Sequence, residues 1–355
     1  IAAITCDATT NTLVYLDEND TSVRPPILWM DVRATEEASF IDTIREEYDA
    51  TKFYKPGFRA DTMVPKCMWV KKNEPENWAK TKTIMEFEDW LNWKLTGRKT
   101  VSMSVAAFRW NYDDKNGGYP VDFYNAVGLD DVIDKFPEPV LKVGEVVGNI
   151  SAEAAEIFGL SKKTVVVEGT ADCNACMFGV GGVRPNGMTL IGGTSTCLLG
   201  LSEEEFHVDG VNGTYPNCMY DGTSLLEGGQ TAAGSILTWF KNNLLPAAWM
   251  QEAVNRNMNI YDLITEKASA VPIGCDGLVM MDYFQGNRAP YADSKARGMF
   301  WGLSIGTTPA HLARAVYEGV AYGANHCIVS MKKAGYDVKE IYACGGLAQS
   351  DFWMQ

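Results

Sequence analysis

The amino-acid sequence predicts an α/β protein with two domains. Its 355 residues amount to about two domains of ordinary size. From residue 164 onward, short β-branched runs each end in a polar or glycine-rich loop, and segments of helical periodicity lie between them. This alternation is typical of mixed α/β sheets. We place the boundary near Gly181-Gly182, which predicts one domain over residues 1–182 and a second over residues 183–355.

Two apolar runs open the chain. Residues 2–6 and 12–16 flank a short polar segment, and two such runs around a polar loop predict an antiparallel hairpin. A helix is expected over 35–48, where apolar residues recur at helical spacing. A second helix is expected over about 82–96, and Gly97 supplies its stop signal.

The second half of the chain follows a clearer pattern. Strands are expected over 164–167, 188–191 and 340–344, and a long helix over about 309–333 precedes the last of them. Sites in α/β sheets form where strands end and loops gather. We therefore expect the chemistry of this protein in the loops that follow these strands.

Composition limits the class of protein. Hydrophobic residues make up 46% and charged residues 21% of the chain, an ordinary globular balance that excludes a disordered, fibrous or disulfide-stapled miniature protein. Lysine and arginine total 31 against 45 acidic residues, which gives a formal net charge of −14. Because this charge repels polyanions, we expect no nucleic acid and no membrane surface as a partner.

Segments that would direct the chain to a membrane are not expected. No apolar run reaches the roughly 18 residues that a membrane-spanning helix needs, and no basic region precedes the apolar start. The nine cysteines are scattered as singles, which is typical of reduced thiols and predicts a cytoplasmic protein. The chain starts inside a strand-like run and stops within an apparent helix, so we expect a fragment of a longer protein.

Two glycine-rich loops follow predicted strands. The loop 192–196 reads Gly-Gly-Thr-Ser-Thr, and its amides and hydroxyl groups could surround a phosphate. It lacks the Gly-Lys-Ser/Thr of a Walker loop, and taken alone a tight hairpin is the simpler interpretation. The loop 345–350 precedes an apparent helix that begins near Ser350. It could hold a nucleotide against the backbone, or it could be a glycine turn that enters a capped helix.

Two acidic residues at the ends of predicted elements are candidates for chemistry. Asp172 ends a strand, where a carboxylate that faces a cleft could orient and deprotonate a hydroxyl group. A loop carboxylate that caps local amides is the commoner case. Glu227 precedes a helical pattern over 232–240, and its simpler interpretation is a helix-entry glutamate that interacts with the helix dipole.

One cysteine pair also carries a recognisable spacing. Cys173 and Cys176 are spaced like a redox motif or half of a zinc site. No second pair stands nearby, and the three histidines are far away in the sequence. A buried pair of small apolar residues is therefore the better interpretation.

Three longer segments occur in an order that points to one family. Gly298-Met-Phe-Trp-Gly-Leu303, followed after seven residues by His311-Leu-Ala-Arg-Ala-Val-Tyr-Glu318, fits the C-terminal signature of the FGGY carbohydrate kinases. Gly286-Asn-Arg-Ala-Pro-Tyr-Ala-Asp293 is similar to the family's Gly-x-Arg-x-Pro-x-x-Asp segment, and Trp29-Met-Asp-Val-Arg-Ala34 to its Trp-x-Asp-x-Arg segment. The resemblance covers essentially the whole chain.

Further segments resemble the ribulokinase type within this family. They are Gly193-Thr-Ser-Thr-Cys197, Leu226-Glu-Gly-Gly-Gln-Thr-Ala-Ala-Gly234 and Asp7-Ala-Thr-Thr10. By this resemblance Asp172 is the catalytic base, and it lines the sugar site together with Thr10, Arg109 and Glu227. Arg109 stands where this type tends to have lysine, which keeps the charge but changes its shape and donors.

The resemblance also implies a nucleotide site. Gly193 and Thr194 would lie beside the phosphates of ATP, and Gly234, Gly345 and Gly346 would lie near the nucleotide. ATP would bind as its Mg²⁺ complex, and the sequence assigns no metal ligands.

The family implies an actin-like, ribonuclease-H-type fold whose two α/β domains close over a cleft. The implied reaction transfers the γ-phosphoryl group of ATP to a terminal hydroxyl of a ketopentose or related polyol, with ribulose ranked first. Xylulose, ribitol or another polyol, or a non-catalytic sugar-binding role, are the alternatives. The oligomeric state stays open, and a homodimer is one candidate.

Two features of the family are not found in this chain. Members begin with an Asp-x-Gly-Thr phosphate loop on a first strand, and nothing like it occurs before Ile4. The final helices that follow the nucleotide-binding glycines are also absent. We therefore expect the fold to be incomplete at both ends and this 355-residue piece alone to be inactive or nearly so.

Overall fold

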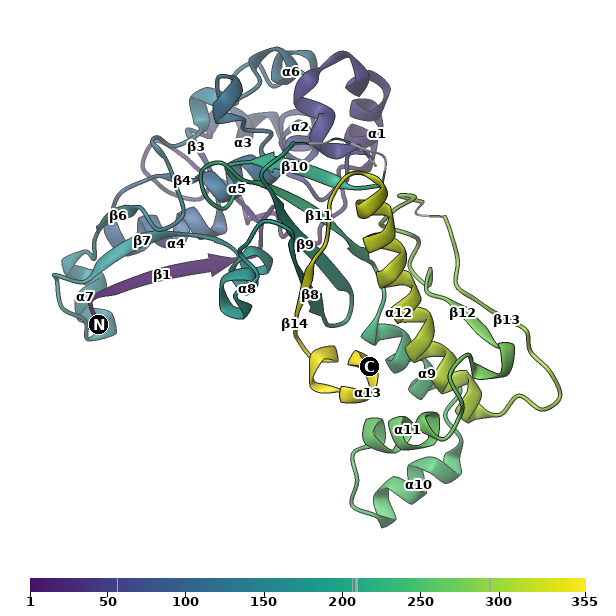
Figure 1. Ribbon diagram of the computed structural model, residues 1–355. Coiled ribbons are helices and arrows are strands. Elements are labelled where there is room, and N and C mark those ends of the chain that lie inside the picture. The colour runs from purple at the N-terminus through teal and green to yellow at the C-terminus, as the bar shows by residue number, and fades with distance from the viewer. Residues whose placement is uncertain (56, 206, 208–209, 294) are drawn as a thin grey trace.

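The structure is a computed structural model that describes residues 1–55, 57–205, 207, 210–293 and 295–355. Its two largest sheets have the strand orders β1-β7-β6 and β10-β11-β9-β8-β14. The five-stranded sheet runs through the middle of the molecule, with α1, α2, α3 and α6 on one side of it and α10 and α11 far away at the opposite end (Figure 1).

The three-stranded sheet brings the start of the chain against a strand that comes much later. β1 (Ala3–Ala8) pairs in parallel with β7 (Val165–Ala171), and β6 (Val146–Asn149) pairs antiparallel with β7. The carboxyl ends of β1 and β7 therefore lie side by side, as the pairing of Ala8 with Ala171 shows.

The predicted hairpin over residues 2–6 and 12–16 is wrong. β2 (Leu13–Leu16) pairs with β3 (Thr83–Glu86) and not with β1. The buried ammonium group of Lys66 donates hydrogen bonds to the carbonyl oxygens of Asn11 and Leu28, at 2.7 and 2.8 Å, and so ties the intervening turn to α2. These long-range contacts direct the chain away from β1.

Helices surround these strands in the first half of the chain. Their bounds are α1 (Thr35–Ile44), α2 (Met63–Asn73), α3 (Pro75–Lys80), α4 (Phe87–Thr96), α5 (Met103–Arg109), α6 (Val121–Ala126), α7 (Ala152–Phe158) and α8 (Asp172–Val180), with the short strands β4 (Val101–Ser102) and β5 (Val140–Leu141) among them. The helix predicted over 35–48 ends as an α-helix at Ile44 and continues as short 3₁₀ turns. The helix predicted over 82–96 starts later, because residues 83–86 form β3; Gly97 ends it in the left-handed conformation, at φ 77°.

The five-stranded sheet carries the second half. Its strands are β8 (Gly187–Gly192), β9 (Thr196–Ser202), β10 (Asn212–Pro216), β11 (Ser224–Gln230) and β14 (Glu340–Cys344). The remaining elements are α9 (Gly234–Asn243), α10 (Ala247–Asn255), α11 (Ile260–Ser269), β12 (Val279–Met281), β13 (Met299–Trp301), α12 (Pro309–Lys333) and α13 (Asp351–Met354). The strands predicted over 188–191 and 340–344 and the helix predicted over 309–333 are confirmed.

Side-chain alternation gives the five-stranded sheet two apolar faces. Leu198 and Leu226 pack with Met331 of α12 on one face. Leu199 and Leu225 belong to the aromatic core of the first half on the other face. Because alternate residues of a strand share a face, Glu227 lies on the face of Leu225, toward α5.

In the part of the chain that the structure describes, no helix is long and apolar enough to cross a membrane.

Candidate active site

Asp172 lies at the carboxyl edge of the three-stranded sheet. It is the first residue of α8, directly after β7, and not the last residue of the strand as the sequence suggested. Its Oδ1 accepts a hydrogen bond from the backbone N–H of Cys173 at 2.7 Å. Asp7 of the adjacent strand β1 pairs with Thr170, so two solvent-exposed carboxylates stand at the same edge.

The surroundings of Asp172 raise the pKa of its carboxyl group above the ordinary value of an aspartate. Partial removal of water by the protein raises the pKa of its carboxyl group, and the negative charge of Asp7 adds to the rise, while the hydrogen bond from Cys173 and the charge of Arg109 oppose it. A carboxylate with a raised pKa is a stronger base. Asp172 is therefore suited to accept a proton from a hydroxyl group.

Three of the predicted sugar-site residues form one continuous chain of contacts. Arg109, the last residue of α5, donates from Nε to Oγ1 of Thr10 at 3.3 Å. Its two terminal nitrogens donate to the two carboxylate oxygens of Glu227, at 3.1 and 3.3 Å. The interpretation of Glu227 as a helix-entry residue is wrong, because this residue lies inside β11 and only 1% of its surface is exposed.

Arg288 was not among the site residues that the sequence predicted, although the structure brings it there. Its guanidinium group forms an ion pair with the same carboxylate of Glu227, from the loop between β12 and β13. The signal that could have found it is the arginine of the Gly-x-Arg-x-Pro segment. Burial alone would raise the pKa of Glu227, but the charges of Arg109 and Arg288 outweigh burial and lower this pKa to about 2. Glu227 is therefore ionised over the whole physiological range.

The predicted nucleotide residues gather at a different place. Gly193, Thr194, Gly234 and Gly346 line one pocket of about 980 Å³ at the end of the five-stranded sheet. The loop 192–196 is the turn of the antiparallel β8–β9 pair, so the hairpin interpretation of its local structure is confirmed. Gly345 is not among the residues that line the pocket.

Close backbone contacts explain two of these glycines. The N–H of Gly234 donates to the carbonyl oxygen of Gly193 at 3.0 Å, and a Cβ atom on Gly234 would lie 2.6 Å from that oxygen. Gly345 has φ 87°, and a Cβ atom there would lie 2.4 Å from the carbonyl oxygen of Gly192. Gly346 is different, since a Cβ atom there would meet nothing within 4 Å. The first two glycines thus hold the loops together, whereas Gly346 leaves open space.

The remaining lining of this pocket is partly aromatic. Tyr261, Tyr317, Phe352 and Trp353 contribute rings, and the ring centroids of Tyr317 and Trp353 are 4.7 Å apart. The indole N–H of Trp353 is buried and has no hydrogen-bond partner in the described part of the chain. Flat apolar ring faces and an unused donor suit a nucleobase, and the backbone amides beside them suit its phosphates.

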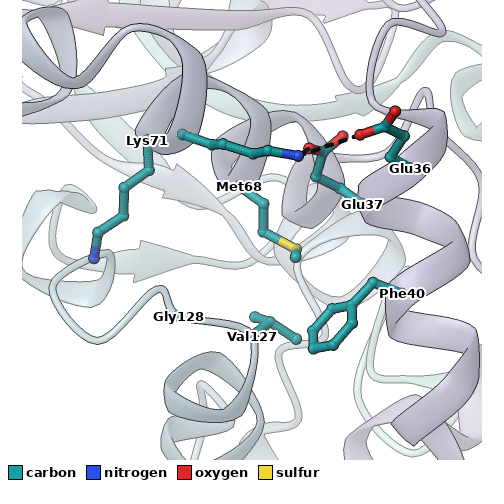
Figure 2. A pocket seen from close by; sticks show the side chains of 8 residues that line it. Glu36, Glu37, Phe40, Met68, Lys71, Val127 and Gly128 are labelled. Carbon is teal, nitrogen blue, oxygen red and sulfur yellow. Dashed lines mark hydrogen bonds and ion pairs between the residues drawn. The ribbon is translucent and has the colours of Figure 1, made fainter.

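A second pocket of about 450 Å³ lies between α1 and α2 (Figure 2). Phe40, Met68 and Val127 form its apolar floor, and Lys72 pairs with Glu36 and Glu37 at its rim. None of the predicted site residues lines it, and we assign it no role in the reaction.

The thiols of α8 and the possible metal ligands remain to be placed. Cys173 and Cys176 are free, half-buried thiols. Within the described residues, no group of three or more histidine, cysteine or acidic side chains is arranged to hold a metal ion. The exposed carboxylate of Asp7 lies at the same strand edge as Asp172, and Mg²⁺ commonly uses one or two carboxylates together with substrate phosphates.

Comparison with known proteins identifies the family. Residues 1–179 match the N-terminal domain, and residues 188–355 the C-terminal domain, of the FGGY family of carbohydrate kinases. The chain belongs to this family. Ribulokinase 2 of Staphylococcus saprophyticus is 30% identical over 99% of this chain and 67% of that protein, and the ribulokinase of Bacillus licheniformis is 30% identical over 100% of this chain and 67% of that protein.

Solved structures of the same family confirm the fold. The xylulose kinase of Rhodospirillum rubrum superposes with a TM-score of 0.85 at 27% identity, over 99% of this chain and 69% of that chain. The Plasmodium falciparum glycerol kinase with ADP superposes with a TM-score of 0.81 at 19% identity, over 100% of this chain and 69% of that chain, and supports the fold alone. The kinase thus has the two-domain actin-like ATPase fold that the sequence predicted, and its family activity is ATP-dependent phosphorylation of sugars.

Proposed function

We propose that this kinase phosphorylates a terminal hydroxyl of a ketopentose, with ribulose as the first candidate. The observation that carries the proposal is the chain of contacts from Thr10 through Arg109 to Glu227, which stands near Asp172 at the strand edge. Donors and acceptors held at fixed positions are what a polar sugar requires. The curated relatives named ribulokinase support ribulose over other acceptors.

In this proposal the sugar site joins two domains. Arg109 comes from the domain over residues 1–182, and Glu227 comes from the domain over residues 183–355. Glu227 is ionised and accepts hydrogen bonds from sugar hydroxyls, while Arg109 and Thr10 donate to sugar oxygens. Thr10, Arg109 and Glu227 are already in contact in the structure, so closure over ATP and sugar serves to exclude water from the phosphoryl group.

Asp172 has the central role in the chemical step. Its carboxylate orients the acceptor hydroxyl and accepts the proton of that hydroxyl as the bond to phosphorus forms. The raised pKa of Asp172 makes the transfer of this proton more favourable. Phosphoryl transfer asks little covalent chemistry of the protein, so positioning and charge neutralisation supply the rest.

ATP occupies the pocket of about 980 Å³ in this proposal. Gly193 and Thr194 lie beside its phosphates, Gly346 leaves room for the ribose or base, and the aromatic rings cover the base. Mg²⁺, when bound, would neutralise phosphate charge, and the exposed carboxylate of Asp7 at the same strand edge would hold it, which leaves Asp172 free to act as the base. We infer that the enzyme acts in the cytoplasm, where ATP is abundant.

A panel of acceptors tests the substrate. The full-length protein is purified and incubated with ATP, Mg²⁺ and either ribulose, xylulose, ribitol or erythritol, and ADP release is followed. The proposal expects ADP release only with sugar present and the highest kcat/KM with ribulose. If kcat/KM is higher with xylulose or ribitol, that acceptor takes the place of ribulose as the proposed substrate. Sugar binding without ADP release would instead identify a non-catalytic sugar-binding protein.

A further inference from the structure

The carboxylate of Glu227 has more positive partners than its charge requires. Glu227 carries one negative charge and is 1% exposed, and it contacts the guanidinium groups of both Arg109 and Arg288. One arginine is enough to neutralise one carboxylate, and a surplus charge in a buried place is costly. Arg288 therefore adds to the charge that keeps Glu227 ionised and also gives its carboxylate a second fixed donor.

The two arginines are attached to different parts of the molecule. Arg109 ends α5 in the first half, where its terminal nitrogens bind Glu227 and its Nε binds Thr10. Arg288 comes from the same half as Glu227 and reaches Glu227 through Nη2. Its buried Nε has no hydrogen-bond partner in the described part of the chain.

The loop that carries Arg288 is fastened to the strand of Glu227. Thr231, four positions after Glu227, donates from Oγ1 to the carbonyl oxygen of Gly286 at 2.9 Å. Within the loop, the side chain of Asn287 donates to the carbonyl oxygen of Ala289 at 3.0 Å and accepts from the N–H of Tyr291 at 2.7 Å. Arg288 therefore starts from a backbone whose place relative to β11 is set before any sugar binds, as a positioning residue requires.

We propose that Arg288 is a positioning residue of the sugar site: from the loop fastened to β11 it holds the Glu227 carboxylate ionised and correctly oriented, so that Arg109 meets this carboxylate in a fixed geometry. This inference rests on the proposed sugar-kinase function. The contact of Arg109 with Glu227 crosses between the halves, whereas the contact of Arg288 stays within one of them.

The charged groups around Glu227 allow the role of Arg288 to be measured through the protonation of Glu227. Besides the two arginines, the charged or titratable groups that influence it are Arg59, Tyr54, Tyr215, Cys173, Cys197 and Cys218. Burial raises the pKa of each of these tyrosines and cysteines, so they stay neutral in acid. Loss of Arg288 should consequently appear as protonation of Glu227 at mildly acidic pH, where the wild-type carboxylate is ionised.

The test measures sugar binding by calorimetry without nucleotide, at pH 4.5 and pH 7.5. It uses ribulose, or whichever acceptor of the panel gives the highest kcat/KM. Arg288→Met should weaken sugar binding about tenfold at pH 7.5 and further at pH 4.5, with ATP affinity unchanged. Arg288→Lys, which keeps the charge without the planar fork, should remove the extra loss at pH 4.5 and restore part of the affinity. Arg256→Met, on an exposed arginine paired with Glu252 and Glu266 at the end of α10, is the matched control and should change neither value.

A double-mutant cycle separates positioning from other roles. If Arg288 acts through Glu227, Arg288→Met should cause no further loss of sugar affinity when Glu227→Gln is already present. Equal losses in both backgrounds, or a loss that does not depend on pH, would overturn the proposal. The Lys variant and the double variant keep the test decisive if Arg288→Met does not fold. A best acceptor other than ribulose contradicts the proposed substrate but not this inference, because the cycle is run with that acceptor.

Discussion

Arg109 at the end of α5 holds Glu227 of β11 by a two-point ion pair, although 118 positions separate them in the sequence. A feature of its own helix or strand explains the position of each residue. α5 is buried along its whole length, which brings its last residue inside. Strand alternation places Glu227 on the face that meets α5. The pair is the direct polar link between the two halves at the proposed sugar site.

Removal of either partner of this pair should weaken sugar binding. Glu227→Ala leaves two guanidinium groups without their carboxylate, and Arg109→Ala leaves Glu227 with Arg288 as its arginine partner, so each change should cost roughly 1–3 kcal/mol of sugar affinity, with the larger loss for Glu227→Ala. ATP affinity should change little, because its pocket has a different lining. Calorimetric titration with sugar and with ATP checks this. An equal loss of affinity for both ligands would contradict the placement of the sugar.

Asp172→Asn should abolish most of the turnover. The amide keeps the size of the side chain but cannot accept the proton, so kcat should fall by about 10²–10⁴-fold while sugar affinity changes little. Steady-state ADP release and sugar titration measure the two quantities. Asp337→Asn, at an exposed position after α12, is the control. Near-normal kcat in Asp172→Asn would remove this residue from the chemical step.

Gly346 offers a clean test of the nucleotide pocket. A side chain there meets no protein atom within 4 Å and its φ is −63°, so Gly346→Val should fold normally while its side chain enters the space proposed for ATP. ATP affinity should fall without dependence on salt, since no charge changes. Gly345→Ala is the contrast, because its clash with Gly192 should lower the thermal stability. Normal ATP binding by Gly346→Val would show that this loop is only a turn.

Thr194→Ala removes one hydroxyl donor from the same pocket. If this hydroxyl binds a phosphate, ATP affinity should drop by roughly 1–3 kcal/mol, as for hydrogen bonds to charged groups. Sugar affinity measured without nucleotide should stay the same. Titration of both ligands decides the matter, and unchanged ATP affinity would place the phosphates elsewhere.

Glu88 should make stability depend on pH. Both of its carboxylate oxygens are buried without a hydrogen-bond partner in the described structure, and burial, followed by the charges of Asp89 and Glu168, raises its pKa well above the usual 4.5. The folded state therefore binds this proton more tightly than the unfolded state. Its contribution is favourable below about pH 4.5 and is lost as pH rises toward the raised pKa.

Glu88→Gln tests this linkage. The variant cannot ionise, so it should be more stable than wild type at pH 8, by about 1–3 kcal/mol, and similar to wild type at pH 4.5. Thermal unfolding at the two pH values measures the difference. Glu76→Gln on the exposed side of α3 should change neither. A stabilisation of equal size at both pH values would contradict the assigned protonation.

Local patterns were sufficient wherever a residue's neighbours in sequence decide its conformation. The helix over 309–333 and the strand over 340–344 follow from periodicity, and Gly97 ends α4 because it adopts the left-handed conformation readily. The family was predictable for a similar reason, since its segments are contiguous in sequence. The roles assigned to Asp172 and to the glycine loops stay predictions until the variants are measured.

Only the tertiary structure decided which distant segments meet. β1 pairs with β7, and not with β2, because a parallel pairing is chosen by packing across the sheet and leaves no signal between neighbouring residues. Glu227 was interpreted as a helix-entry residue because a helical pattern over 232–240 follows it, yet pairing with β9 keeps it in a strand. The contact of Arg288 with Glu227 likewise depends on how a loop of the second half folds back onto β11. Periodicity reports how a segment buries its own face, whereas the choice of partner depends on the shape and charge of surfaces that form only when the whole chain folds.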